Sequence, residues 1–210
     1  MRMKDQLTLL FDLGGVIMEI RRDDAVEALR ALGMTEANDF LGEYGQKGPF
    51  LALEKGEISP EEFRRQVRPM LRPGVTDTEI DDAFNRFLTG IPLHRLRALE
   101  RLHATHRIYM LSNTNAIMWH SRIAQEFRKD GHEMEYYFDG VVPSFEVHAY
   151  KPDAAIFRIA QERFGLDPAG TLFLDDSEAN CRAAAALGFR TAHVRPGSEF
   201  TDYIPADDSL

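Results

Sequence analysis

The stretch LTLLFDLGG at residues 7–15 runs from a short apolar segment directly into an aspartate and two glycines. A brief apolar run that ends in turn residues is typical of a strand buried within a parallel sheet. Three later runs, at 108–111, 171–174 and 191–194, have the same character and also end in turn or cap residues. We therefore expect four buried parallel strands.

Helical patterns lie between the later runs. Apolar residues recur at three- and four-residue spacing over 95–103, 117–127, 153–164 and 178–187. Glycines at 165 and 188 follow the last two patterns and indicate helix ends. Strands that alternate with helices of this length predict an α/β fold built on a doubly wound parallel sheet.

The segment from about 23 to 89 has helical periodicity and almost no strand signal. Ser59 followed by Pro60 and two glutamates predicts a helix start, with an N-cap and proline at the first helical position. We assign 1–20 and 90–210 to a core and 21–89 to a helical cap above the strand ends. Its helices are expected at 24–32, 36–42, 50–55, 60–71 and 77–88.

Composition excludes several classes of protein. Of 210 residues, 44% are hydrophobic and 28% charged, as in folded globular chains. A formal charge of -9 opposes binding to nucleic acid or anionic lipid. The first apolar run is far too short for a membrane span, and a single cysteine, Cys181, excludes a disulfide framework and a cysteine zinc cluster. We expect a cytoplasmic monomer or homodimer.

Polar side chains follow the apolar runs, at the edge of the sheet where ligands bind in parallel α/β folds. Asp12 follows the first run, Ser112 the second and Asp175-Asp176 the third, and Lys151 precedes a helix. Three carboxylates at one point repel each other unless a cation compensates them, and an all-oxygen set favours Mg²⁺ over zinc. The pattern predicts a magnesium site.

Such a site suits phosphoryl transfer through an aspartyl phosphate, with Asp12 as the nucleophile. Lys151 would neutralise charge on both the nucleophile and the phosphate. The Ser112 hydroxyl would bind the phosphoryl group, with backbone amides around Gly14 and Asn113.

The acidic pair Asp175-Asp176 has a separate role at the metal. Asp176 would bind Mg²⁺, and Asp175 would order the water shell of the ion.

Four motifs, in order, resemble those of the haloacid dehalogenase-like hydrolases. They are residues 11–17 (FDLGGVI), 111–115 (LSNTN), 150–153 (YKPD) and 173–177 (FLDDS), within a similarity that spans 7–194. The segment LEKGEIS at 53–59 is similar to the cap of the small capped sugar-phosphate phosphatases of the α-glucose-1-phosphate phosphatase type. This resemblance implies a Rossmann-like core, a helical cap inserted after the first strand, Mg²⁺ dependence, an aspartyl phosphate and a small phosphorylated metabolite as substrate.

Gly14 departs from the pattern of most phosphatases in that superfamily, which have aspartate two residues after the nucleophile as general acid and base. By resemblance, the Gly14 carbonyl still binds the metal, but no side chain there protonates a leaving oxygen. Loss of a positioned acid costs about 10²–10⁴-fold in rate.

Other interpretations remain open. Taken alone, 12–15 is a strand-to-turn signal, and 112–115 and 175–177 are helix caps. A metal-independent haloacid dehalogenase would use Asp12 on carbon, and the absence of a general acid at Gly14 motivates a non-catalytic binding protein. Which of four cap residues enters the pocket depends on helix orientation, which spacing does not fix: Tyr44, Lys47, Phe50 or Glu54.

Overall fold

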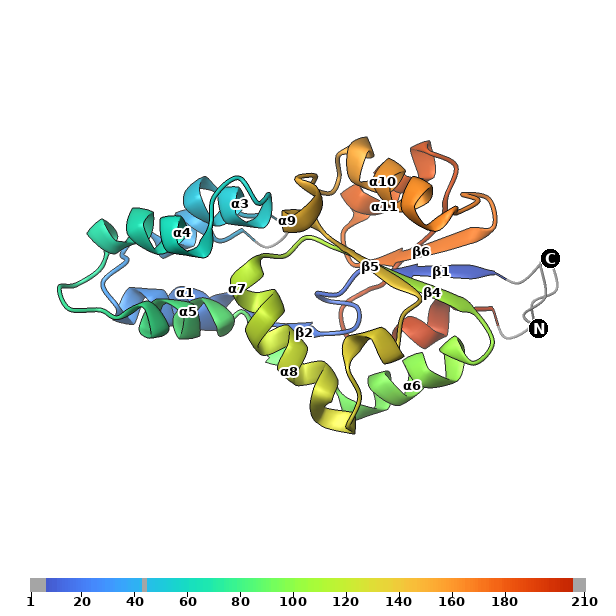
Figure 1. The fold of residues 1–210 in the computed structure, drawn as a ribbon, viewed down its shortest axis with the longest axis horizontal. Helices are drawn as coiled ribbons and strands as arrows, with labels where there is room; N and C mark the ends of the chain where they lie inside the picture. Colours follow the sequence, from blue (N-terminus) through green and yellow to red (C-terminus); the bar gives the residue numbers. More distant parts are fainter. Residues whose placement is uncertain (1–6, 43–44, 206–210) are drawn as a thin grey trace.

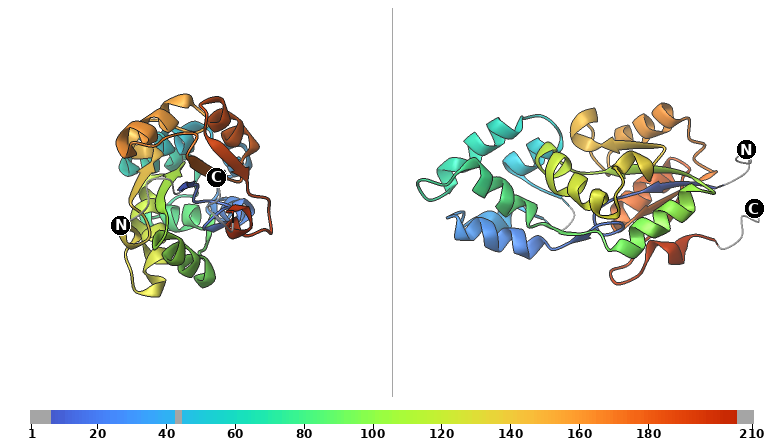
Figure 2. Two further views of the ribbon diagram at one scale, coloured as in Figure 1. Left: turned by 90° about the vertical axis from the view of Figure 1, so that its right-hand side faces the viewer. Right: turned by 60° about the horizontal axis from the view of Figure 1, so that its bottom comes forward.

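A computed structural model describes residues 7–42 and 45–205. A five-stranded sheet covered by helices forms one lobe, and a set of helices forms a second lobe beside it (Figure 1). The right-hand view in Figure 2 also shows the two lobes side by side. Among the described residues, no helix is long and apolar enough to cross a membrane.

The sheet has the order β5-β4-β1-β6-β7, and all neighbouring strands are parallel. From the central strand the chain moves outward on one side, then crosses back and continues on the other, so the order reverses beside β1. Ligands bind at such a reversal in doubly wound sheets. The strands are β1 Thr8–Phe11, β4 Arg107–Ser112, β5 Gly140–Pro143, β6 Thr171–Asp175 and β7 Arg190–His193.

The doubly wound α/β sheet and its four expected strands are confirmed, but β5 was not expected. This strand begins with glycine, ends with proline and lies at the edge of the sheet, with only two of its four residues buried. Both residue types are depleted in strands, so its sequence resembles a loop.

Side chains of β1 alternate between two apolar layers. Leu9 and Phe11 pack into the layer on the side of α6 and α8, whereas Leu10 packs with Phe157 of α10 on the opposite face (Figure 1). All three are fully buried. A nearly continuous apolar run is therefore what a sheet covered on both faces requires.

The core helices other than α9 lie close to their expected positions, and α9 was not expected from the sequence. They are α6 Leu93–His103, α7 Ala116–Met118, α8 Ala124–Phe127, α9 Ser144–Val147, α10 Ala154–Phe164 and α11 Glu178–Ala186. The helix expected at 117–127 is made of α7 and α8 joined by a π-helical turn at Trp119–Ile123. Short 3₁₀ turns lie at Arg128–Asp130, Met134–Tyr136 and Phe200–Tyr203.

The second lobe, here called the cap, lies between two short antiparallel strands, β2 and β3. Its elements are β2 Glu19–Ile20, α1 Arg22–Ala31, α2 Ala37–Phe40, α3 Gly48–Glu54, α4 Pro60–Val67, the 3₁₀ turn Arg68–Met70, α5 Asp77–Asn85 and β3 Leu88–Gly90. The Ser59 cap of α4 is confirmed, because its Oγ accepts a hydrogen bond of 3.2 Å from the Glu62 amide. The α-helix stops at Val67, earlier than expected, because Pro69 lacks an amide hydrogen.

Three phenylalanines form the centre of the cap. The Phe50 ring lies 4.9 Å from Phe63 and 5.0 Å from Phe84, edge to face in both cases. All three are fully buried. These rings belong to the same apolar cluster as Leu9 and Phe11 of the sheet.

A buried carboxylate fixes the point where the chain returns from the cap to the core. Glu126 of α8 is 1% exposed, and its Oε2 accepts a hydrogen bond of 2.8 Å from the Ile91 amide. Gly90, at φ 141°, lies so close that a Cβ there would be 2.9 Å from the same oxygen. A side chain at this position would therefore displace the carboxylate.

Candidate active site

The carboxyl ends of three neighbouring strands bring together side chains that are far apart in the sequence. Ser112 ends β4 and Asp175 ends β6, the two strands that flank β1. Asp12 follows β1 directly, and its amide donates a hydrogen bond of 2.8 Å to the Leu174 carbonyl. The three residues therefore lie on one edge of the sheet, at the reversal of strand order.

Three carboxylates form the centre of this site. Oxygen atoms of Asp12, Asp175 and Asp176 all lie within 4.8 Å of one another. Asp12 is 8% exposed and Asp175 is fully buried, while Asp176 is partly exposed. Water therefore screens their repulsion poorly.

Lys151 supplies the positive charge within this cluster. Its Nζ lies 2.7 Å from Asp12 Oδ1 and 2.7 Å from Asp175 Oδ2, and the side chain is 1% exposed. Asn113 holds the backbone of Lys151 through two hydrogen bonds, accepting from the amide at 2.8 Å and donating to the carbonyl at 3.0 Å. The Asn113 side chain thus positions the lysine.

Asp175 is hydrogen-bonded through both carboxylate oxygens. Oδ1 accepts from the Ser177 amide at 2.8 Å and from Asn180 Nδ2 at 3.0 Å, while Oδ2 accepts from Lys151. Asp175 is the most buried carboxylate of the cluster, and its contact with Lys151 orients the ammonium towards Asp12. Asn180, one turn into α11, was not expected from the sequence, because a lone asparagine on a helix carries no distinguishing pattern.

The pKa values of the two metal-site carboxylates reflect burial first and the crowding of negative charge second. Burial, followed by the charges of Asp175 and Asp176, raises the pKa of Asp12 to about 8, although Lys151 opposes the shift. Burial and the charge of Asp175 raise the pKa of Asp176 to about 6. Burial alone lowers the pKa of Lys151, but attraction from Asp12 and Asp175 outweighs it, so the ammonium form is favoured.

The donor set fits a divalent cation. The carboxylates of Asp12 and Asp176 provide hard oxygen ligands, which suit Mg²⁺. At Gly15, where φ is 74°, a Cβ would lie 2.1 Å from Asp176 Oδ2, so the turn after β1 leaves space that only glycine allows. Gly14 in the same turn lines the cavity above the carboxylates.

A cavity of about 90 Å³ lies over this cluster. Its floor includes Asp12, Lys151 and Ser112, whose side chain is 2% exposed. The expected site residues thus surround one cavity or brace its floor: Asp12, Gly14, Ser112, Asn113, Lys151, Asp175 and Asp176. Asn115, in the same segment as Ser112, caps α7 by accepting a hydrogen bond of 3.0 Å from the Met118 amide, so this motif also has its structural function.

The cap covers the other side of the cavity. Gln46 and Glu54 line it together with apolar residues, and Glu54 is 5% exposed. Tyr150, next to Lys151 in sequence, donates a hydrogen bond of 2.8 Å to Glu54 Oε2. Burial raises the pKa of Glu54 to about 7, and the Tyr150 hydrogen bond acts in the opposite direction.

Glu54 is also fixed through its backbone. Ser144 Oγ, fully buried at the start of α9, lies 2.6 Å from the Glu54 carbonyl oxygen and accepts a hydrogen bond from the Thr114 amide at 2.9 Å. The end of α3 is therefore tied to the segment that follows β4.

The other cap candidates have different positions. Phe50 lies in the aromatic cluster, and Lys47 lines a separate depression with residues of α1 and α2. Tyr44 lies outside the described residues.

Comparisons with known proteins agree with this geometry. A family model described as haloacid dehalogenase-like hydrolase matches residues 7–188. A D-ribitol-5-phosphate phosphatase from Bacteroides thetaiotaomicron is 33% identical over 192 residues, which cover 91% of this chain and 93% of the relative.

Solved structures give the same result. A wild-type haloacid dehalogenase-family enzyme from Bacteroides thetaiotaomicron, in complex with magnesium and inorganic phosphate, has a TM-score of 0.88 and 36% identity, covering 95% of this chain and 100% of that one. A predicted family hydrolase from Porphyromonas gingivalis has a TM-score of 0.87 and 31% identity, covering 94% and 95%. An L-2-haloacid dehalogenase, at 18% identity and a TM-score of 0.56, shares the fold alone.

Proposed function

This chain belongs to the haloacid dehalogenase-like hydrolases and is a phosphatase, and we propose that it hydrolyses a small phosphorylated sugar or sugar alcohol with Mg²⁺, through an aspartyl phosphate on Asp12. The observation that carries this proposal is the contact between Asp12 and Lys151 beside the Asp176 carboxylate, under one cavity.

Asp12 is the nucleophile of the proposed reaction. Its Oδ attacks phosphorus while the bond to the leaving oxygen breaks, and water later cleaves the aspartyl phosphate. The attacking carboxylate must be ionised, although burial favours its neutral form. Lys151, at 2.7 Å, stabilises the ionised form and remains charged throughout.

The remaining site residues bind the phosphoryl group and the metal. Ser112 and Asn113 line the cavity, and the Ser112 hydroxyl and the backbone amide of Asn113 would donate hydrogen bonds to phosphoryl oxygens. Asp12, Asp176 and the Gly14 carbonyl would hold Mg²⁺, with Asp175 ordering its surroundings. When bound, the ion supplies positive charge that allows a carboxylate to approach a phosphate dianion.

The substrate class rests on two further observations. The relative that is 33% identical is named as a D-ribitol-5-phosphate phosphatase. The polar cap side chains Gln46 and Glu54 also line the cavity, which suits hydroxyl groups of a polyol or sugar.

Hydrolysis assays test the proposal directly. Purified protein should release phosphate from p-nitrophenyl phosphate and from members of a panel of sugar and sugar-alcohol phosphates, including D-ribitol 5-phosphate, when Mg²⁺ is present. EDTA should abolish turnover, and excess Mg²⁺ should restore it. Turnover that continues in the presence of EDTA would contradict the metal requirement. A panel of sugar and sugar-alcohol phosphates with no turnover would contradict the proposed substrate class.

A further inference from the structure

The cavity is lined by a third carboxyl group, that of Glu54, which is neither the nucleophile nor part of the metal cluster. Phosphorylation of Asp12 by an alkyl phosphate expels an alkoxide, which leaves slowly unless it is protonated. Gly14 offers no side chain for this purpose. Among the described residues that line the cavity, five have ionisable side chains: Asp12, Glu54, Tyr150, Lys151 and Asp176.

Three of these five side chains already have other roles in the proposed reaction. Asp12 attacks phosphorus, Asp176 is placed at the metal, and Lys151 is held by two carboxylates that favour its charged form. Tyr150 already donates its hydroxyl hydrogen to Glu54, and burial raises its pKa. Glu54 is the remaining group that can give up a proton near neutral pH.

The position of Glu54 suits the leaving group. In an in-line displacement, the leaving oxygen lies on the side of phosphorus away from the nucleophile. Asp12 lies at the strand ends, so the leaving oxygen faces the cap, and Glu54 comes from cap helix α3. We propose that Glu54 is the general acid and base of this phosphatase, in place of a side chain at position 14; the inference rests on the proposed function.

The proton transfers balance over two steps. In the first, the Asp12–phosphorus bond forms, the bond from phosphorus to the leaving oxygen breaks, and that oxygen takes the proton from the Glu54 carboxyl group. In the second, the Glu54 carboxylate takes a proton from the water that attacks phosphorus, and the Asp12–phosphorus bond breaks. Glu54 is then neutral again, and Asp12 is a free carboxylate.

The surroundings of Glu54 allow it to hold and release a proton. Tyr150 is the ionisable group that faces its carboxyl, and the hydrogen bond between them fixes Oε2. Helix α3 packs against α4 and α9, and its Phe50 ring also contacts Phe40 of α2 and Phe84 of α5. The charged side chains of these four helices, and that of His148 directly after α9, are all partly or fully exposed. Among them, Glu62 is paired with Arg65 and Arg64 with Asp81. The full set is Asp39, Glu61, Glu62, Arg64, Arg65, Asp77, Glu79, Asp81, Asp82, Glu146 and His148.

The test compares leaving groups. Phenyl phosphate and p-nitrophenyl phosphate share a ring, but phenolate is the poorer leaving group and depends more on protonation. In Glu54→Gln, kcat/KM should fall by about 10²-fold or more with phenyl phosphate or D-ribitol 5-phosphate, and by less than about 5-fold with p-nitrophenyl phosphate. Because water attack also slows, p-nitrophenyl phosphate should give a rapid burst of about one nitrophenolate per enzyme before a slow steady state.

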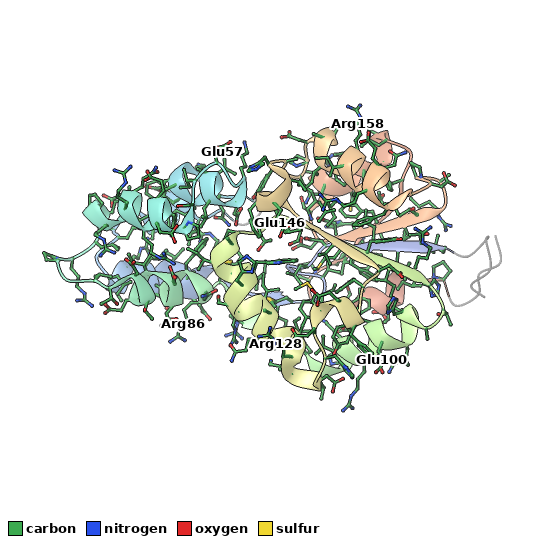
Figure 3. All side chains as sticks on the ribbon, in the orientation of Figure 1. Glu57, Arg86, Glu100, Arg128, Glu146 and Arg158 are labelled. Carbon is green, nitrogen blue, oxygen red and sulfur yellow. The ribbon has the colours of Figure 1, made fainter. Side chains whose placement is uncertain are left out.

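Glu57→Gln is the matched control. It makes the same chemical change three residues away, at an exposed cap position (Figure 3), and should leave both rates unchanged. The small effect on p-nitrophenyl phosphate also shows that the Glu54→Gln site is intact.

An equal fall in kcat/KM for both aryl esters, or no fall for either, overturns the assignment of Glu54. A wild-type chain that hydrolyses none of these esters removes the proposed function itself. The two failures are distinct, because only the first is seen with an active wild-type enzyme.

Discussion

Removing the Glu126 carboxylate should loosen the return point between the cap and the core. In Glu126→Ala, the Ile91 amide loses its acceptor while it stays buried, since Ile91 is 2% exposed. An unsatisfied buried donor costs about 1–3 kcal/mol. Arg122 and Lys129 also lose their ion pairs with this carboxylate, but they are 33% and 46% exposed, so each adds well under about 1 kcal/mol. The total loss in unfolding free energy is therefore about 1–4 kcal/mol.

A second substitution separates the amide contact from the ion pairs. Glu126→Gln keeps an oxygen for the Ile91 amide and loses only the charge, so it should cost about 1 kcal/mol. Urea unfolding followed by circular dichroism at neutral pH measures both variants, with equal slopes expected. Glu133→Gln, which breaks a surface pair with Arg128, should stay close to wild type.

Two results would refute this reasoning. Glu126→Ala within about 1 kcal/mol of wild type would mean that the Ile91 amide finds another acceptor. Equal losses for the alanine and glutamine variants would mean that the ion pairs, rather than the amide contact, stabilise the return point.

Four further outcomes are expected. Asp12→Asn should fold normally but release no phosphate above background from p-nitrophenyl phosphate, since its amide is a poor nucleophile; measurable turnover would reassign the nucleophile. Phe50→Ala should lower the unfolding free energy by about 3–5 kcal/mol, because a fully buried ring leaves a cavity in the cap; a loss below about 1 kcal/mol would show that the cap adds little to stability. Burial raises the pKa of Glu54 from 4.5 to about 7, so the contribution of this group to the stability of the fold is fully present below pH 4.5 and is lost as the pH rises through 7. Urea titrations at several pH values should show wild type losing about 3 kcal/mol of unfolding free energy relative to Glu54→Gln across that window. Parallel curves for the two proteins would contradict the shift. Burial also raises the pKa of Cys181 to about 12, so iodoacetamide should label the folded chain far more slowly than the urea-unfolded chain, as mass spectrometry can measure.

Short apolar runs predicted the sheet because both of its faces are covered. At 7–11 and 171–174, burial on two sides favours mostly apolar residues on both faces of the strand, and this pattern is visible without any partner strand. Edge strand β5 and the short β2–β3 pair depend instead on neighbours that supply their hydrogen bonds. Their residues alone do not distinguish them from loops.

The same distinction, between local sequence and packing against other elements, applies to the residues of the candidate site. Asp12, Ser112 and Asp175 were predictable because strand ends define their position, whatever the exact packing. Glu54 was one of four cap candidates, because its direction depends on how α3 rotates against α9. The contact between Ser144 and the Glu54 backbone sets that rotation, and it joins residues 90 positions apart. No local pattern encodes such a distance.

The apolar cluster that runs from the cap phenylalanines to the layer beneath the sheet has a thermodynamic consequence. Two lobes joined only by polar contacts melt in separate steps, whereas a shared interior couples them into one cooperative transition. Heating should therefore disassemble both lobes together, in a single calorimetric peak.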